Sequence, residues 1–216
     1  MKQLAVLSFF LFCAISLSAQ NKESLSIQSA IDACVALRNA VVSKDPAAIR
    51  QSAKTLHAVG ASSFTTLRCT DEDYASLNGH LVFDEAFANG LAEGQDVYQK
   101  ADYINKNIIH RGQTFDGSIL TKTCFVKAGK SSKYTFASKG HQELAVVAEA
   151  GGLVTMKIHV TNSAGFDKRF DDTKSVKRGM AQRKTSFELP TDRMNTVELE
   201  IVNCGKKDCS FVVISN

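Results

Sequence analysis

The sequence predicts an α+β protein, in which a mainly helical N-terminal half is followed by an antiparallel β-sandwich of the jelly-roll kind. Two patterns carry this prediction. In residues 24–60 apolar side chains recur every three or four positions, the spacing of a helix that buries one face. After residue 110 they alternate with polar side chains in short runs, the spacing of half-buried strands. We therefore expect a signal peptide at 1–19, a helical region at 20–110 and a β-sandwich domain at 111–216.

The first nineteen residues have the pattern of a secretory signal peptide. Lys2 provides a positive start, an apolar run covers residues 4–17, and small residues precede a predicted cleavage after Ala19. The run is shorter than the ~20 apolar residues that a spanning helix needs, and no later stretch qualifies as a transmembrane segment. The chain is therefore expected to be exported, to the periplasm, the cell surface or the medium.

The helical half is best defined at its start. One amphipathic helix is predicted within 24–43, and a second follows, with Asp45 as its N-cap, Pro46 in its first turn and Gly60 at its end. So short a join predicts that the two helices are antiparallel. In 61–110 we expect a short helix from Thr70 to Leu77, then either a strand near residue 82 or the start of a helix there, and helical spacing again from Val97.

The C-terminal half contains short β-rich runs separated by glycine, lysine and asparagine. Leu144, Val146 and Ala148 alternate with their neighbours, and a second alternating run follows the Gly151-Gly152 turn. About six to eight strands at this spacing are typical of an antiparallel sandwich.

The order of motifs in this half resembles that of bacterial pre-peptidase C-terminal domains. The resemblance covers at most the last hundred residues and implies a jelly-roll sandwich with an accessory or binding role, without catalytic residues. The matching residues are Phe125, Ala128, Gly129, Tyr134, Phe136, Leu144, Val146, Val147, Gly151, Gly152, Leu199, Ile201, Asn203, Ser210, Phe211 and Ile214.

Two cysteines near the C-terminus are predicted to clamp a β-hairpin. If Cys204 lies opposite Cys209, the antiparallel register places Ile201 opposite Val212 and Leu199 opposite Ile214, on one apolar face. In an exported protein the default for such a pair is a disulfide. The other face of this hairpin is mixed, and we expect the helical half or a partner to cover it.

Three further cysteines follow the leader: Cys34, Cys69 and Cys124. A Cys34–Cys69 bridge within the helical half is the preferred pairing, whereas Cys34–Cys124 or Cys69–Cys124 would join the two halves. Spacing alone does not choose among them. No paired C-x-x-C spacing is present, so the cysteines do not indicate a zinc site or another metal.

Composition argues against some classes of partner. The net charge of +4 is small and both signs are mixed along the chain, so the charge pattern does not indicate a nucleic-acid partner. The absence of tryptophan removes the most common aromatic platform for sugars, although tyrosine could serve. The expected partner is an unidentified protein or glycan in the envelope or outside the cell.

One long basic stretch is a candidate contact surface for an anionic ligand or a protein. Seven cations in residues 165–185 are interleaved with aspartates in what we expect to be a long loop between strands. They are Lys168, Arg169, Lys174, Lys177, Arg178, Arg183 and Lys184.

The leading interpretation is a non-catalytic binding or structural role, with no cofactor and no catalytic residue assigned. The alternatives are a secreted hydrolase or thiol enzyme with its site between the two halves, and an accessory factor or inhibitor of another secreted protein. Acid pairs such as Asp84–Glu85, or a thiol near a histidine, would support an enzyme.

Overall fold

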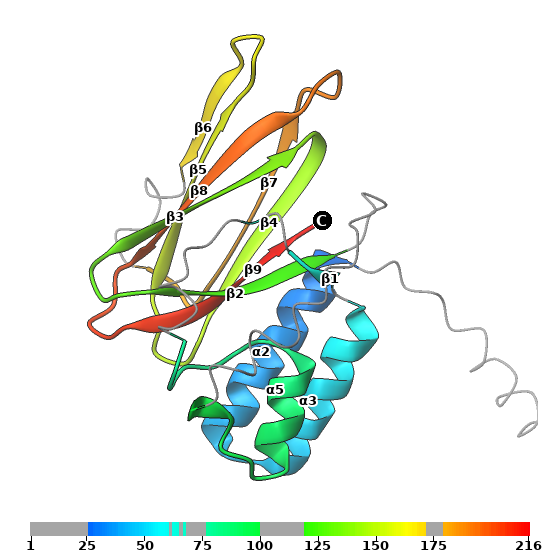
Figure 1. The fold of residues 1–216 in the computed structure, drawn as a ribbon, viewed down its shortest axis with the longest axis vertical. Coiled ribbons are helices and arrows are strands. Elements are labelled where there is room, and N and C mark those ends of the chain that lie inside the picture. The colour runs from blue at the N-terminus through cyan, green and yellow to red at the C-terminus, as the bar shows by residue number, and fades with distance from the viewer. Residues whose placement is uncertain (1–25, 61, 65–66, 68–76, 100–118, 172–178) are drawn as a thin grey trace, which may run out of the picture.

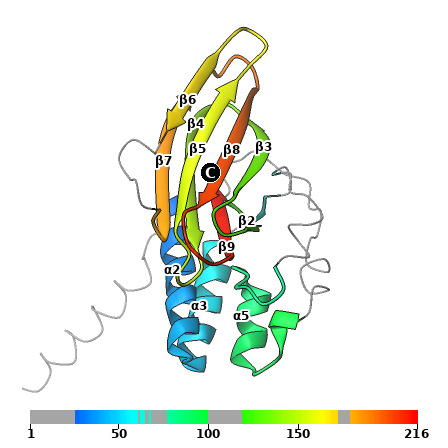
Figure 2. The ribbon, with the colours of Figure 1, turned by 90° about the vertical axis from the view of Figure 1, so that its left-hand side faces the viewer.

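The structure, a computed structural model, describes residues 26–60, 62–64, 67, 77–99, 119–171 and 179–216. Helices lie against one end of a two-sheet sandwich (Figure 1), and the turned view shows helix α2 next to strand β4 (Figure 2). This is the predicted α+β class. The expected boundary at residue 110 lies outside the described residues. Within the described residues, no helix is both long and apolar enough to cross a membrane.

The two predicted helices are confirmed. Helix α2 covers Ile27–Ser43 and helix α3 covers Pro46–Val59. The Asp45 carboxylate accepts hydrogen bonds from the N–H groups of Ala47 and Ala48 at the start of α3. The two-residue join makes α2 and α3 run in opposite directions side by side (Figure 1).

Of the two structures expected near residue 82, a strand or the start of a helix, the strand is absent. Leu81, Val82 and Phe83 are all buried, but they form an irregular segment that leads into helix α5 (Glu85–Ala92). Asp84 caps α5 by accepting from Phe87 N–H. A 3₁₀ turn, η1 (Val97–Gln99), replaces the first part of the expected later helix. The helix expected at 70–77 lies outside the described residues except for Leu77.

The strands form two sheets with the strand order of a jelly roll. Sheet A has, in spatial order, β1 (Ser62–Ser63), β2 (Leu120–Val126), β9 (Cys209–Ser215), β4 (Gly140–Ala148) and β7 (Gln182–Leu189). Sheet B has β3 (Ser131–Ser138), β8 (Asn195–Asn203), β5 (Val154–Thr161) and β6 (Asp167–Asp171). All pairs are antiparallel except the short contact of β1 with β2.

The predicted C-terminal hairpin is wrong. Strand β8 pairs with β3 and β5 in sheet B, whereas β9 pairs with β2 and β4 in sheet A. Ile201 therefore lies opposite Met156 and Ser132, and Val212 lies opposite Thr123 and Val147. The reason is topological, because consecutive strands of a jelly roll can cross from one sheet to the other instead of forming a hairpin.

This strand arrangement determines where the cysteines lie. Cys204 is exposed in the loop between β8 and β9, Cys209 is buried in β9, and neither forms a disulfide in the structure. The predicted antiparallel register that supported a Cys204–Cys209 bond is therefore wrong. Cys34 is a buried thiol of α2. Its pairing with Cys69 stays a prediction, because Cys69 lies outside the described residues.

Helical cover of the sandwich is present, but on different residues from those expected. Ala145, Val147, Val212 and Ile214 point to the outer face of sheet A and share one apolar core with the helices. Phe211 and Val213 belong to the mixed face of the predicted hairpin, which we expected the helical half or a partner to cover, but they lie in the second core between the sheets. Strand β9 is buried at every position because it has an apolar layer on each side.

Candidate functional site

The outer face of sheet B carries a dense set of charged side chains. Along β8, Val197, Leu199 and Ile201 are fully buried between the sheets. Strand alternation therefore turns Glu198 and Glu200 outward, where they are partly exposed. The same alternation in the neighbouring strands turns out Lys133, Lys157, His159 and Arg169, so one polar face is built from all four strands.

Ion pairs cross this face between neighbouring strands. Lys133 Nζ lies 3.4 Å from Glu198 Oε1, and Lys157 Nζ lies 3.4 Å from Glu200 Oε2. Toward the edge, His159 Nε2 lies 2.9 Å from Asp167 Oδ1. These are partly exposed pairs, which contribute about 0–1 kcal/mol each to stability. The cross-strand pairs hold the side chains in place more than they stabilise the fold.

A hollow of about 280 Å³ opens on this face. Its lining includes N–H donors and carboxylate acceptors together, and none of these residues carries a phenyl, phenol or indole ring. They are Lys133, Lys157, Ile158, His159, Arg169, Glu198 and Glu200. Such a lining can both donate hydrogen bonds to a ligand and accept them from it.

The predicted basic surface is only partly brought together. Lys168 and Arg169 are in β6 at one edge of sheet B, and Arg169 lines the hollow. Arg183 and Lys184 are in β7 at one edge of sheet A, where Lys184 Nζ pairs with Glu143 Oε1 at 2.9 Å. Lys174, Lys177 and Arg178 lie outside the described residues. The structure thus places the four described cations on two sheets.

Sequence reasoning missed the lysines and glutamates of the hollow as a site. The signal was present in residues 197–201, where two glutamates alternate with three apolar residues. That pattern shows that Glu198 and Glu200 share one face. The pairing with β3 and β5, which brings Lys133 and Lys157 beside them, depends on the sheet order.

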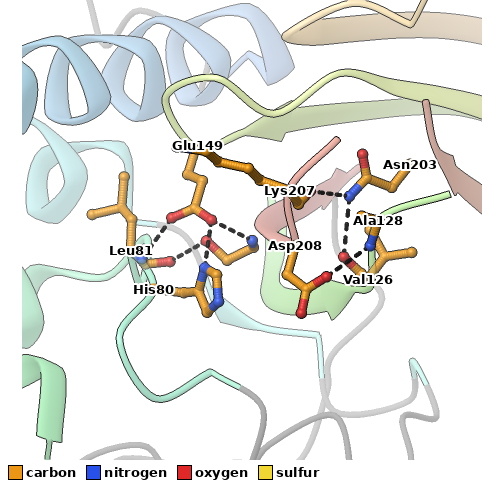
Figure 3. A network of polar contacts seen from close by, with 9 residues as sticks. His80, Leu81, Val126, Ala128, Glu149, Asn203, Lys207 and Asp208 are labelled. Carbon is orange, nitrogen blue, oxygen red and sulfur yellow. Dashed lines mark hydrogen bonds and ion pairs between the residues drawn. The ribbon is translucent and has the colours of Figure 1, made fainter. Parts of the chain in front are cut away.

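A second polar cluster joins the helical half to the sandwich (Figure 3). The Glu149 carboxylate, just after β4, lies 2.6 Å from His80 Nδ1 and accepts from the N–H groups of Leu81 and Ser210. Ser210 Oγ in turn donates to the Leu81 carbonyl at 2.7 Å. The hydrogen bond to Glu149 raises the pKa of His80, against the opposing effect of burial. Both carboxylate oxygens of Glu149 are engaged within the protein.

The cluster continues into the loop between β8 and β9. Asn203 Nδ2 donates to the carbonyls of Val126 and Lys207, and Asp208 Oδ1 accepts from Ala128 N–H (Figure 3). Asn203 is fully buried. These bonds hold the 204–208 loop against the end of β2, which is a structural role.

A third region bears on the thiol-enzyme alternative. Cys34 and His57 line one cavity of about 320 Å³ between the helices and sheet A, together with Asp84 and Glu85. Burial raises the pKa of Cys34 to about 12, so its sulfur stays a thiol, which is a weak nucleophile. His57 Nδ1 is bound to Glu85 Oε2 at 2.8 Å, and Asp84 is engaged as the cap of α5. This geometry does not favour a thiol nucleophile.

The described residues contain no group of three or more His, Cys, Asp or Glu side chains placed to hold a metal ion.

Comparison with solved structures finds similarity of low identity over about half of the chain. No protein-family model matches the chain, and no curated protein matches it. A Yersinia pseudotuberculosis-derived mitogen shares 10% identity with a TM-score of 0.35, over 45% of this chain and 84% of that one. The CBM22-1 xylan-binding domain of Paenibacillus barcinonensis Xyn10C shares 9% identity with a TM-score of 0.29, over 49% of this chain and 76% of that one.

TmCBM61, solved in complex with beta-1,4-galactotriose, shares 6% identity with a TM-score of 0.29, over 48% of this chain and 85% of that one. Scores this low carry no argument about what this chain binds. The class of the protein is therefore defined by its own strand order: a jelly-roll β-sandwich with helices packed on one sheet.

Proposed function

We propose that this chain is a non-catalytic binding protein whose ligand surface is the outer face of sheet B, and that its ligand is a hydroxyl-rich polymer, a glycan. The observation that carries the proposal is the hollow on that face, lined by charged donors and acceptors from all four strands. The described helices pack against the other sheet, so none of them covers this face.

The chemistry of the hollow suits a glycan better than a protein partner. Protein interfaces draw most of their affinity from central aromatic and apolar anchors, and Ile158 is the one aliphatic residue in the lining. Sugar hydroxyl groups donate and accept at once, which matches lysine and arginine N–H groups set beside carboxylates. Without an aromatic platform, the charged side chains must supply the affinity.

The paired glutamates support binding over hydrolysis. Glu198 and Glu200 are two carboxylates on one face, which is the minimum that glycoside hydrolysis requires. Each is ion-paired with a lysine on an open sheet face. A general acid needs a desolvated carboxyl group, whereas Glu198 and Glu200 are both partly exposed to solvent.

In our proposal the predicted signal peptide at 1–19 directs the chain out of the cytoplasm, where it binds its ligand. The resemblance to pre-peptidase C-terminal domains fits the same accessory role for the sandwich. Cell fractionation, with mass spectrometry of the mature N-terminus, tests export: we expect a protein that begins near residue 20 in the envelope or the medium. A full-length protein confined to the cytoplasm would contradict it.

Affinity electrophoresis in gels that contain xylan, galactan, polygalacturonate or chitosan tests the binding face. We expect retardation by at least one polymer, and about tenfold weaker retardation after Lys157→Ala or Arg169→Ala, since a charge-assisted hydrogen bond contributes about 1.5 kcal/mol. Lys184→Ala is the matched control, because it removes an ion-paired lysine from sheet A. Absence of retardation by all four polymers, or equal weakening by the control, would overturn the proposal.

A further inference from the structure

A separate cavity of about 310 Å³ lies where the helices meet the sandwich. It is lined by α2, by the irregular segment before α5, by η1 and by the turn after β4. The residues are Arg38, Val41, Gly79, Leu81, Tyr98, Glu149 and Ala150. The cavity is distinct from the hollow of sheet B, because no residue lines both.

Arg38 is the cation of this cavity, and its position is fixed. Its Nη1 donates to the carbonyl of Ala181 at 3.2 Å and to that of Ala148 at 3.4 Å. Its hydrogen bonds to the described residues use Nη1 alone, so the N–H groups on Nε and Nη2 are available to donate to a ligand. Burial lowers the pKa of Arg38, so the guanidinium is partly stripped of water while remaining charged.

The carboxylate in the cavity is already engaged elsewhere. Both oxygens of Glu149 accept hydrogen bonds, from His80, Ser210 and Leu81. Among the described residues Arg38 forms no ion pair with it. Burial, together with the charge of Glu149, raises the pKa of Tyr98, so its hydroxyl remains a donor. The cavity thus presents a cation and a phenol beside the apolar side chains of Val41, Leu81 and Ala150.

We propose that this cavity binds a small organic carboxylate with a compact apolar body. The carboxylate accepts from the remaining guanidinium N–H groups of Arg38, a fork that matches two carboxylate oxygens. The apolar body lies against Val41, Leu81 and the Tyr98 ring. An apolar cavity of about 150 Å³ accommodates benzene, so the present volume has room for one ring with its acid group. Such a ligand would contact both the helices and the sandwich.

Isothermal titration of the full-length mature protein with phenylacetate tests the site, with the neutral analogue phenylacetamide as the comparison. We expect saturable one-to-one binding of phenylacetate and at least tenfold weaker binding of phenylacetamide. No saturable binding of phenylacetate, or equal binding of the two compounds, would overturn the proposal.

Two pairs of variants locate the binding. Val41→Phe fills the cavity and is expected to weaken phenylacetate at least tenfold, whereas Val42→Phe, at a neighbouring residue that is 61% exposed, leaves it unchanged. Arg38→Lys is expected to weaken it similarly. Arg50→Lys is its control, because Arg50 also bonds a backbone carbonyl, that of Ala92, away from the cavity. Equal effects within either pair would refute the assignment.

These results are independent of the glycan proposal. Lys157→Ala should leave phenylacetate binding unchanged, and Val41→Phe should leave retardation by polysaccharide unchanged. If phenylacetate binding is lost with Lys157→Ala, the cavity is not the site.

Discussion

Nδ1 of His80 lies 2.6 Å from Oε1 of Glu149, across the boundary between the helical half and the sandwich. The two side chains are only 22% and 16% exposed. His80 precedes the buried 81–83 segment, and Glu149 follows β4, so the pair connects elements far apart in the sequence. Its hydrogen bond raises the pKa of His80, which makes the connection depend on pH.

The first prediction concerns the pH dependence of stability. The folded pKa of His80 lies above its ordinary value of 6.5, so the folded state binds the proton more tightly than the unfolded state does. The stabilisation by this pair is fully present below about pH 6.5 and is lost as the pH rises through the raised folded pKa. In urea unfolding, the difference between wild type and His80→Gln should be largest below about pH 6.5 and should shrink as the pH rises above it.

The control is His141→Gln. His141 Nδ1 also lies 2.6 Å from a carboxylate, that of Glu188, but these side chains are 54% and 75% exposed. The unfolding free energy of the His141→Gln variant should follow that of the wild type across the pH range. A wild-type advantage over His80→Gln that stays constant or grows with pH would contradict the assignment.

The second prediction isolates the carboxylate of the same pair. Glu149→Gln turns an amide N–H₂ toward groups that donate hydrogen bonds, so at least one buried N–H loses its acceptor. We expect a loss of about 2–4 kcal/mol in the free energy of unfolding. Glu188→Gln, the exposed counterpart, should change it by less than about 0.5 kcal/mol. Similar losses in both variants would show that the Glu149 network contributes no more than a surface pair.

The third prediction concerns the reactivity of the cysteines. Cys204 is exposed and forms no disulfide in the structure, so iodoacetamide should alkylate it in the native protein. Burial raises the pKa of Cys34 and of Cys209 to about 12, with the charges of Glu149 and Asp208 adding to the effect at Cys209. Both should react only after unfolding. Peptide mapping by mass spectrometry gives each rate, and a Cys204 that reacts only after reduction would restore the disulfide interpretation.

The local features of the fold were readable from the sequence, and the long-range ones were not. Asp45, Pro46 and Gly60 define the second helix because capping acts within a few residues. The alternation of Val197, Leu199 and Ile201 likewise shows which face of β8 is inside. The strand with which β8 pairs, however, depends on the arrangement of all the other strands. The apolar residues of β8 and β9 matched in an antiparallel register, yet these two strands do not pair with each other.

The same limit applies to the candidate sites. Glu198 and Glu200 lie on one strand, so their common face can be inferred from the sequence. Their lysine partners come from β3 and β5, which are distant in the chain. His80 and Glu149 are separated by 69 residues and carry no motif. Side chains that meet only through sheet order leave no spacing signal.

The last prediction tests the helical cover of sheet A. In a fragment of residues 111–216, Val212 and Ile214 would lose the helices that bury them and leave an exposed apolar patch. We expect this fragment to aggregate, and the double change Val212→Lys with Ile214→Lys to keep it soluble and monomeric in sedimentation experiments. In the full-length protein the same double change should cost at least about 3–5 kcal/mol, because two charges are then buried against α2.

Val213→Lys provides the matched control, since Val213 faces the core between the two sheets. That change should disrupt the fragment and the full-length protein alike, because the sandwich core is the same in both. The contrast between neighbouring positions of β9 follows from strand alternation, which turns residues 212 and 214 to the helices and residue 213 to sheet B. A wild-type fragment that is soluble and monomeric would mean that sheet A needs no helical cover.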